Sequence, residues 1–163
     1  TCPSIDLTRQ LKSDKVFPSE KIFFLPDPII SIKEFISSIK LSNKINVEKP
    51  KNKFFISVGR LTKQKNFKYL INEFTKFCKS NNDYDLFIFG EGEEKNRLGN
   101  LINKNQMNNK IFLKGYSKDI FFFMKEAEAF VLSSLWEDPG FVIIEAALSN
   151  LSIISSNCKN GPS

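Results

Sequence analysis

The chain has 163 residues and no histidine, and this absence restricts its chemistry more than any residue that it contains. Without imidazole there is no histidine general base, no Ser-His-Asp or Cys-His triad, and none of the usual zinc ligand sets. The sequence therefore disfavours both a hydrolase of the triad type and a zinc site.

Cysteine and long apolar runs are also scarce. The three cysteines, Cys2, Cys78 and Cys158, are widely scattered and form no Cys-x-x-Cys pair, which indicates reduced thiols in a cytosolic compartment. No apolar run approaches the ~20 residues that a membrane-spanning helix needs, and no amino-terminal apolar segment indicates secretion. We therefore expect a cytoplasmic protein.

The composition is that of a folded domain. Apolar residues make up 41% of the chain and charged residues 26%, which excludes both disorder and a membrane span. The net charge of +6 suits a phosphate-bearing ligand or an anionic membrane surface, although ordinary solubility charge gives the same value. Because the chain opens at Thr1 and stops at Ser163 directly after a strand-like run, we expect an internal fragment of a longer protein.

From Lys53 onward, short apolar runs alternate with segments of helical period, which is typical of βαβ units around a parallel sheet. This predicts an α/β, Rossmann-like domain over residues 53–163. Its predicted strands, each apolar enough to be covered on both faces, are Phe54–Val58, Leu86–Phe89, Ile111–Leu113, Ala129–Leu132 and Ser152–Ile154. Helices are predicted after Asn66, around Leu98, from Ser117 and over Phe141–Leu148. Right-handed crossovers would gather the strand-to-helix loops, and with them the ligand residues, on one rim.

Residues 1–52 differ in composition from the rest. The apolar run Phe23-Phe24-Leu25 is stopped by Pro26 and Pro28, and a stretch rich in Lys, Ser and Asn follows, as in a hinge or linker. Within it an amphipathic helix is predicted from the spacing of Ile32, Phe35, Ile36 and Ile39. Such a helix either packs on its own domain, which is the commoner case, or contacts the inner face of a membrane.

Glu137 and Glu145 stand eight positions apart, directly after the strand predicted at Ala129–Leu132. Asp138 can cap the next helix and Pro139 fits its first turn, which leaves Glu137 on a loop and Glu145 in the second turn. A helix that aims its N–H groups at a strand tip forms an anion site, here with two carboxylates beside it to accept bonds from hydroxyl groups. Phosphate and polyol together describe a nucleotide sugar, although two glutamates at this spacing also occur by chance.

Two cations and a glycine follow the first predicted strand. Gly59 permits close approach to the backbone, Arg60 offers a planar fork to phosphate oxygens, and Lys65 adds a mobile charge. The alternative is that both cations are solvated loop residues. The second strand runs into Gly90-Glu91-Gly92, which lacks the third glycine and the later acid of a dinucleotide-binding fingerprint. It therefore predicts a tight turn, with close approach to a ligand still possible.

The segment Asp83-Tyr84-Asp85 has the pattern of the Asp-x-Asp pair with which metal-dependent transferases hold a cation against a diphosphate. Here the pair precedes the second predicted strand, at the amino-terminal rim and opposite the loops that should bind ligand. Paired surface aspartates are common, and we expect no metal site.

Taken in order, these motifs resemble the carboxy-terminal half of the group 1 retaining glycosyltransferases. The segments that carry the resemblance are Val58-Gly59-Arg60-Leu61, Lys65-Asn66, Phe89-Gly90-Glu91-Gly92, Leu113-Lys114-Gly115-Tyr116, Glu137 to Glu145, and Asn157 with Gly161-Pro162. Leu25-Pro26-Asp27-Pro28 is similar to the segment where that family's chain enters this half. The resemblance implies a GT-B architecture of two facing Rossmann-like domains. Residues 53–163 would be the donor-binding domain, and residues 1–52 the hinge and the tail of a missing amino-terminal domain.

The resemblance also implies a role for each matching residue. Arg60 and Lys65 would bind the donor diphosphate without an essential metal, Glu145 the ribose hydroxyls, and Glu137 the hydroxyls of the transferred sugar. Further substrate contacts would come from Gly59, Gly90, Gly92, Gly115, Tyr116, Gly140, Phe141 and Val142. The loop departs from the Glu-Gly-Phe-Gly of many members, but the spacing of the two glutamates is kept.

The function that the resemblance implies is retaining transfer of a hexose or N-acetylhexosamine from a nucleoside diphosphate sugar to a glycan or lipid-linked acceptor. Cell-surface polysaccharide biosynthesis uses such enzymes. Neither a cofactor beyond the donor substrate nor a nucleic acid partner is expected. Two alternatives stay open, namely a non-catalytic module that binds nucleotide sugar, and a sugar epimerase of similar architecture, although such epimerases depend on histidine.

Overall fold

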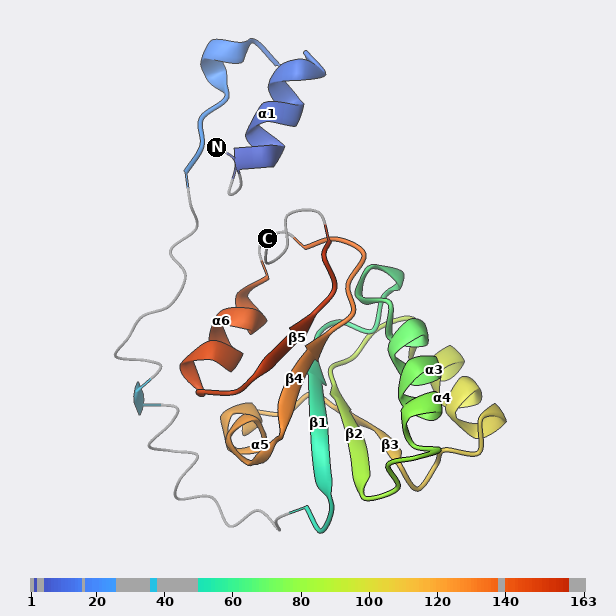
Figure 1. The fold of residues 1–163 in the computed structure, drawn as a ribbon. Helices are drawn as coiled ribbons and strands as arrows, with labels where there is room; N and C mark the ends of the chain where they lie inside the picture. Colours follow the sequence, from blue (N-terminus) through green and yellow to red (C-terminus); the bar gives the residue numbers. More distant parts are fainter. Residues whose placement is uncertain are drawn as a thin grey trace.

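A parallel sheet of five strands forms the centre of the protein (Figure 1). The computed structural model describes Cys2 and residues 5–15, 17–25, 36–37, 50–137 and 140–158. The strands are β1 (Lys53–Val58), β2 (Tyr84–Phe89), β3 (Ile111–Gly115), β4 (Ala129–Leu132) and β5 (Ile153–Ser155), arranged in the order β3-β2-β1-β4-β5. All four neighbouring pairs are parallel, which confirms the Rossmann-like α/β prediction.

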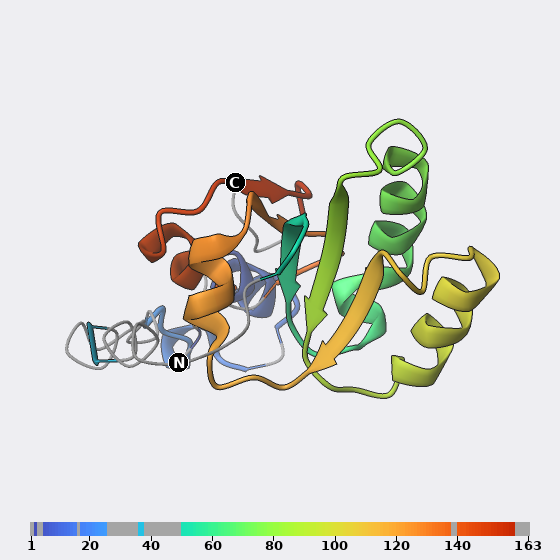
Figure 2. The same ribbon diagram turned by 90° about the horizontal axis from the view of Figure 1, so that it is seen from below.

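Helices cover both faces of this sheet (Figures 1 and 2). One face carries α3 (Phe67–Phe77), which follows the short 3-10 helix η2 (Lys63–Lys65), and α4 (Lys95–Lys104). The other face carries α5 (Ile120–Glu126) and α6 (Phe141–Leu148). The chain therefore winds along both sides of the sheet, as in doubly wound α/β folds.

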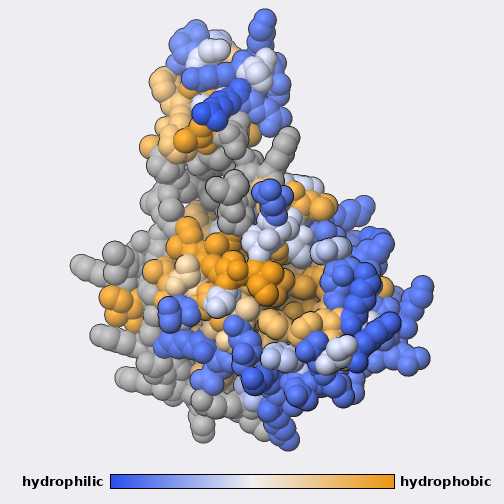
Figure 3. Space-filling view, in the orientation of Figure 1, coloured by the Kyte–Doolittle hydropathy of each residue, from blue (hydrophilic) through white to orange (hydrophobic). Residues whose placement is uncertain are grey.

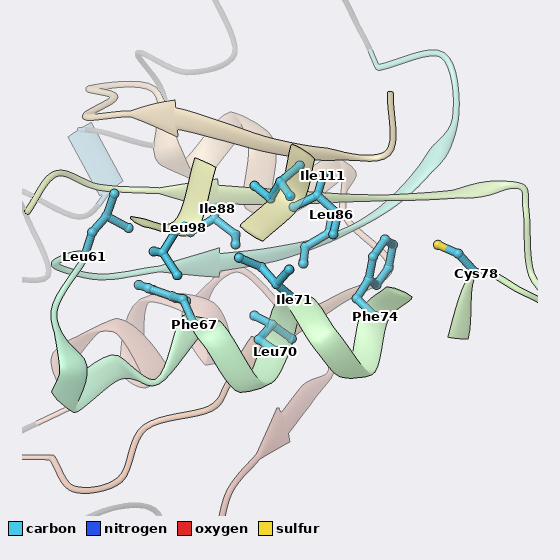
Figure 4. Packing of buried hydrophobic residues seen from close by; sticks show 11 residues of the cluster. Leu61, Phe67, Leu70, Ile71, Phe74, Cys78, Leu86, Ile88, Leu98 and Ile111 are labelled. Atoms are coloured by element: carbon cyan, nitrogen blue, oxygen red, sulfur yellow. The ribbon is translucent and has the colours of Figure 1, made fainter. Parts of the chain in front are cut away.

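The alternation of side chains along the strands fills two separate cores. Leu86 and Ile88 of β2 point to α3 and α4, where the α3 stripe of Phe67, Leu70, Ile71 and Phe74 packs on them (Figure 4). The residues between them, Phe87 and Phe89, lie in the second core with Phe54, Ile56, Met124, Phe130, Leu132 and Ala146. Strands buried on both faces read as continuous apolar runs, which is why β1 and β2 were recognisable from sequence.

Every strand except β4 has a bound that differs from the prediction by one or two residues, and two of these strands also differ in burial. β2 begins at Tyr84 rather than Leu86, so Asp85 lies inside the strand and is buried. Its carboxylate accepts hydrogen bonds from the Asn52 side-chain amide and lies 3.5 Å from Lys110 Nζ, and this pairing allows a charged residue there. β5 is exposed along its length instead of covered on both faces, because α3 and α4 extend over β1 to β3. Figure 3 shows apolar surface where β5 lies in Figure 1.

The helix starts also differ in detail. Asn66 precedes α3 as predicted but adopts a left-handed conformation (φ 51°, ψ 37°) without a capping side-chain hydrogen bond, because the chain must turn there from η2 into α3. The helix predicted from Ser117 begins at Ile120, and the Ser117 hydroxyl instead accepts a hydrogen bond from the Asp119 N–H. The bounds of α6 are those predicted, whereas the expected cap at Asp138 and Pro139 lies outside the described residues.

The amino-terminal part contains α1 (Ile5–Ser13) and the short 3-10 helix η1 (Ser19–Lys21), and Cys2 forms a parallel bridge with Phe24. Figure 1 shows α1 apart from the helices that flank the sheet. Of the predicted amphipathic helix, only Ile36 belongs to the described residues, and the division of the chain at residue 52 stays a prediction. No helix in the described ranges is long and apolar enough to cross a membrane.

The strand order places a switch point between β1 and β4. From β1 the chain adds β2 and β3 on one side, and then returns to add β4 and β5 on the other. At such a reversal the loops leave the carboxyl ends of the two strands in opposite directions and open a crevice that binds ligands in open α/β sheets. The loops after β1 and β4, which contain Arg60, Lys65 and Glu137, meet at this point.

Backbone hydrogen bonds tie the loops after β1, β2 and β3 together. The Gly59 N–H donates to the Phe89 carbonyl at 3.0 Å, and the Gly90 N–H donates to the Gly115 carbonyl at 2.8 Å. Gly90 has φ +136°, and a Cβ placed there would overlap the carbonyl oxygen of Gly59. Only glycine can hold these loops this close, so Gly90 fixes the shape of the rim behind Arg60.

We predict that Gly90→Ala destabilises the fold by at least about 1–3 kcal/mol, since it combines backbone strain with a clash against a main-chain atom. Gly99→Ala in α4 is the matched control, because a Cβ there meets nothing within 4 Å. That change should stabilise by about 0.5–1 kcal/mol. Urea unfolding measures both; a neutral Gly90→Ala would contradict the close packing of these loops.

Candidate functional site

Two adjacent hollows lie at the carboxyl ends of β1 and β4. The larger has a volume of about 560 Å³ and the smaller about 320 Å³. Both are lined by Val58, Gly59, Arg60 and Glu145, so these four residues form the shared wall. The hollows lie at the switch point, where the topology alone places a ligand crevice.

The larger hollow, here called the α5-side hollow, lies between the loops after β2 and β3 and the start of α5. Its remaining lining is Phe89, Gly90, Glu91, Tyr116, Ser117, Lys118, Ile120 and Phe121. Tyr116 stands at the rim with 76% of its surface exposed. A mainly apolar floor with polar groups at the edge suits a flat ring whose hydrogen-bonding atoms lie at its edge.

The smaller hollow, here called the α6-side hollow, contains a buried ion pair. Lys65 Nζ lies 2.7 Å from Glu137 Oε1 and 2.8 Å from Oε2. The two side chains are only 13% and 3% exposed. The buried Ser134 hydroxyl also donates a hydrogen bond to Glu137 Oε1. The other lining residues are Gln64, Gly140, Phe141 and Val142.

The loop after β4 holds Lys65 in place through its serines and backbone. Ser133 Oγ donates to the Lys65 carbonyl at 2.8 Å, and the Leu135 N–H donates to the Gln64 carbonyl at 2.8 Å. Gly59 leaves room for the lysine stem, since a Cβ there would lie 3.0 Å from Lys65 Cε. Lys65 is therefore positioned by the loop after β4, which is distant in sequence, and by the space that Gly59 leaves beside it.

Arg60 and Glu145 differ from this pair because neither side chain is engaged. Among the described residues, none forms a hydrogen bond or ion pair with the Arg60 guanidinium or the Glu145 carboxylate. Arg60 is exposed, whereas Glu145 lies half-buried in the second turn of α6. Burial raises the pKa of Glu145 because the low dielectric disfavours its charged form. Both groups are thus available to a ligand in either hollow.

The amino-terminal end of α6 completes the α6-side hollow. The N–H groups of Phe141 and Val142 belong to the first turn, where a helix offers no internal carbonyl partner. Together with the helix dipole they favour negative charge. Arg60 and Lys65 balance Glu137 and Glu145, so the side chains here combine anion donors with hydroxyl acceptors at near-zero formal charge.

Ten of the twelve residues predicted for the site line one hollow or the other: Gly59, Arg60, Lys65, Gly90, Tyr116, Glu137, Gly140, Phe141, Val142 and Glu145. Gly92 and Gly115 do not line either of them. A Cβ at Gly92 would lie 2.5 Å from the Leu61 carbonyl oxygen, and Gly115 has φ +71°, so both are required by loop packing. Their contact with a ligand stays a prediction.

Sequence reasoning missed Ser133 and Ser134. A signal for Ser134 was present, since serine followed three residues later by glutamate is the capping-box pattern. In the structure the Ser134 hydroxyl donates a hydrogen bond directly to the Glu137 carboxylate, and neither side chain caps a helix. The mutual pairing of Lys65 and Glu137 was also not anticipated, because the sequence resemblance assigns them to different parts of a donor.

Comparison with known proteins identifies the family. The chain belongs to the glycosyl transferases group 1, whose family model matches residues 38–163. It is 44% identical over 108 residues to a glycosyltransferase of Methanocaldococcus jannaschii, covering 66% of this chain and 27% of that protein. It is 34% identical over 144 residues to UDP-Gal:alpha-D-GlcNAc-diphosphoundecaprenol alpha-1,3-galactosyltransferase of Escherichia coli, covering 84% of this chain and 37% of that protein.

A solved structure shows the same fold. A TarM mutant of S. aureus, crystallised with fondaparinux, alpha-GlcNAc-glycerol and UDP, has a TM-score of 0.78 at 21% identity, covering 99% of this chain and 30% of TarM. At this identity the likeness concerns the fold alone, and it confirms the Rossmann-like half of a GT-B protein. The chain spans 27–37% of the length of these three proteins.

We predict that Lys65→Met lowers the free energy of unfolding by about 3–5 kcal/mol, because it leaves Glu137 buried without its cation. The double variant Lys65→Met/Glu137→Met should recover most of this loss, since an apolar pair needs no counter-charge. Lys76→Met is the control, because it breaks an exposed, solvent-screened Lys–Glu pair on α3 and should change the free energy of unfolding little. Urea unfolding tests the cycle, and equal losses from Lys65→Met and Lys76→Met would contradict a buried pair.

The half-buried Glu145 should make stability depend on pH. Because its pKa is raised above the ordinary 4.5, the folded state binds a proton that the unfolded chain has already lost. Stability should therefore fall as pH rises from about 4.5 to the raised folded-state pKa. We predict that Glu145→Gln removes this fall, while Glu73→Gln on the exposed face of α3 retains it. Unfolding curves across this pH window provide the measurement, and an unchanged slope in Glu145→Gln would refute the assignment.

Proposed function

We propose that this chain is the donor-binding half of a retaining glycosyltransferase that uses a nucleoside diphosphate sugar. One observation carries the proposal. Two hollows of different character meet at Arg60 and Glu145, at the switch point of a sheet that belongs to the group 1 glycosyltransferases. A nucleotide sugar likewise has a flat base and a polyol sugar on either side of a ribose and a diphosphate.

The diphosphate is assigned to Arg60, Lys65 and the first-turn N–H groups of α6. A guanidinium fork, an ammonium and a helix dipole together neutralise negative charge as it develops on the departing diphosphate. This assignment makes a divalent cation unnecessary. The candidate aspartate pair supports it, since Asp83 and Asp85 lie at the opposite end of β2 and Asp85 is engaged by Lys110 and Asn52.

The base, the ribose and the transferred sugar are each assigned to a different part of the two hollows. Glu145 lies in both hollows and accepts hydrogen bonds from the ribose hydroxyls. The base extends into the α5-side hollow, near Gly115 and Tyr116, while the transferred sugar enters the α6-side hollow and bonds to Glu137. Lining residues that accept and donate on opposite walls would hold the donor in one orientation.

Binding of the acceptor is assigned to a facing domain of the whole protein rather than to this chain. The E. coli relative is named for a diphosphoundecaprenol-linked acceptor, which supports a lipid-linked or glycan acceptor here as well. Transfer needs the donor and acceptor held together in a closed cleft, so a facing amino-terminal domain would supply the second wall. A cytoplasmic enzyme at the inner face of the membrane, acting in polysaccharide biosynthesis, fits such an acceptor.

A donor screen tests this function. The full-length protein, with its facing acceptor domain, should bind one of UDP, GDP or ADP in calorimetric titration and turn over the corresponding sugar nucleotide with an acceptor, and NMR of the product should show a retained anomeric configuration. Glu145→Gln should weaken nucleotide binding, whereas Glu137→Gln should mainly impair transfer. Binding without turnover would instead indicate a non-catalytic module, and an inverted product would refute retention.

Transfer should also persist in EDTA, because the charge of the diphosphate is met by side chains and helix N–H groups rather than by a cation. Donor turnover measured before and after chelation, with manganese or magnesium added back, provides the check. Loss of activity that either metal restores would overturn the metal-free assignment.

A further inference from the structure

Lys65 and Glu137 form an ion pair with each other, although the proposed function assigns them to different parts of the donor. Lys65 Nζ bonds both Glu137 oxygens at 2.7 and 2.8 Å, within a hollow where both side chains are largely buried. The cation that should meet the diphosphate is thus already neutralised. The carboxylate that should meet the sugar already has two donors, Lys65 and Ser134.

A free nucleoside diphosphate therefore faces a cost at this pair. To bind Lys65 fully it must draw the ammonium away from Glu137, which leaves a 3% exposed carboxylate with only the Ser134 hydroxyl as a donor. A buried carboxylate that loses its cation is strongly unfavourable. An intact donor lowers this cost, since its phosphate replaces Glu137 at Lys65 while its sugar hydroxyls donate to Glu137 in place of Lys65.

Resting on the proposed function, we propose that the Lys65–Glu137 pair discriminates the intact sugar nucleotide from the free nucleoside diphosphate. The donor exchanges both partners of the pair at once, whereas the product can exchange only one. Once the sugar has been transferred, the pair re-forms and displaces the diphosphate from Lys65. The same two side chains that hold the donor then promote release of the product.

The surroundings of Glu137 fit this exchange. Ser134 is 2% exposed, and its own carbonyl accepts a hydrogen bond from Ser156 Oγ at 2.7 Å, so the serine is fixed from both sides. Ser134 therefore acts as a positioning residue that holds the Glu137 carboxylate when Lys65 departs. Lys65 has the longer and more flexible side chain, and its stem lies in the space that Gly59 leaves open.

The ratio of two dissociation constants tests this inference. The protein is titrated with UDP, GDP and ADP and with UDP-glucose, GDP-mannose and ADP-glucose, and the pair that binds is used throughout. Glu137→Gln frees Lys65, so it should tighten binding of the diphosphate by about tenfold and weaken binding of the sugar nucleotide. The preference for the intact donor should disappear. Glu137→Asp, which keeps the charge but shortens the side chain, should give an intermediate ratio and serves if the glutamine variant does not fold.

Glu73→Gln is the matched control, because it removes one negative charge from an exposed Lys–Glu pair and should leave both constants unchanged. Unchanged or weaker diphosphate binding in the Glu137 variants would overturn the inference. Lys65 would then bind Glu137 and phosphate at the same time. If no nucleotide binds to the wild-type protein, the proposed function itself fails, and the two failures are thus distinguishable.

Discussion

The central strand β1 is the constraint on which the rest of the structure depends. It is hydrogen-bonded to β2 on one side and to β4 on the other, and its side chains contribute to both cores. Phe54 and Ile56 face α5 and α6, while Ser57 satisfies its buried hydroxyl by bonding the Val131 carbonyl at 2.6 Å. The backbone that leaves β1 at Gly59 and Arg60 therefore enters the site from a rigid base.

The site combines groups that would be unstable apart. A buried lysine, a buried glutamate and a half-buried glutamate each resist desolvation, and the structure compensates only some of that cost. Lys65, Glu137 and Ser134 satisfy one another, whereas Arg60 and Glu145 are engaged by none of the described residues. The unengaged groups form the wall shared by both hollows. The two hydrogen-bonding groups that are unpaired among the described residues therefore lie where a charged, hydroxyl-rich ligand can bind them.

Sequence reasoning recovered what depends on local pattern. The strands buried on both faces and the bounds of α6 follow from local pattern, and most of the candidate site follows from placing motifs at strand ends. The misses depend on distant contacts. Asp85 can lie in β2 only because Lys110 and Asn52 meet it, and Lys65 meets Glu137 across 72 positions of sequence. No local sequence pattern predicts either set of contacts.

The position of β4 has a consequence for the order of folding. β1, α3, β2, α4 and β3 follow one another along the chain, so their half of the sheet can form through short-range closures. Docking of β4 instead joins Ser57 to Val131, 74 positions away, and carries a larger entropic cost of closure. The hollows exist only after that step. We therefore expect ligand binding to appear only after β4 has docked on β1.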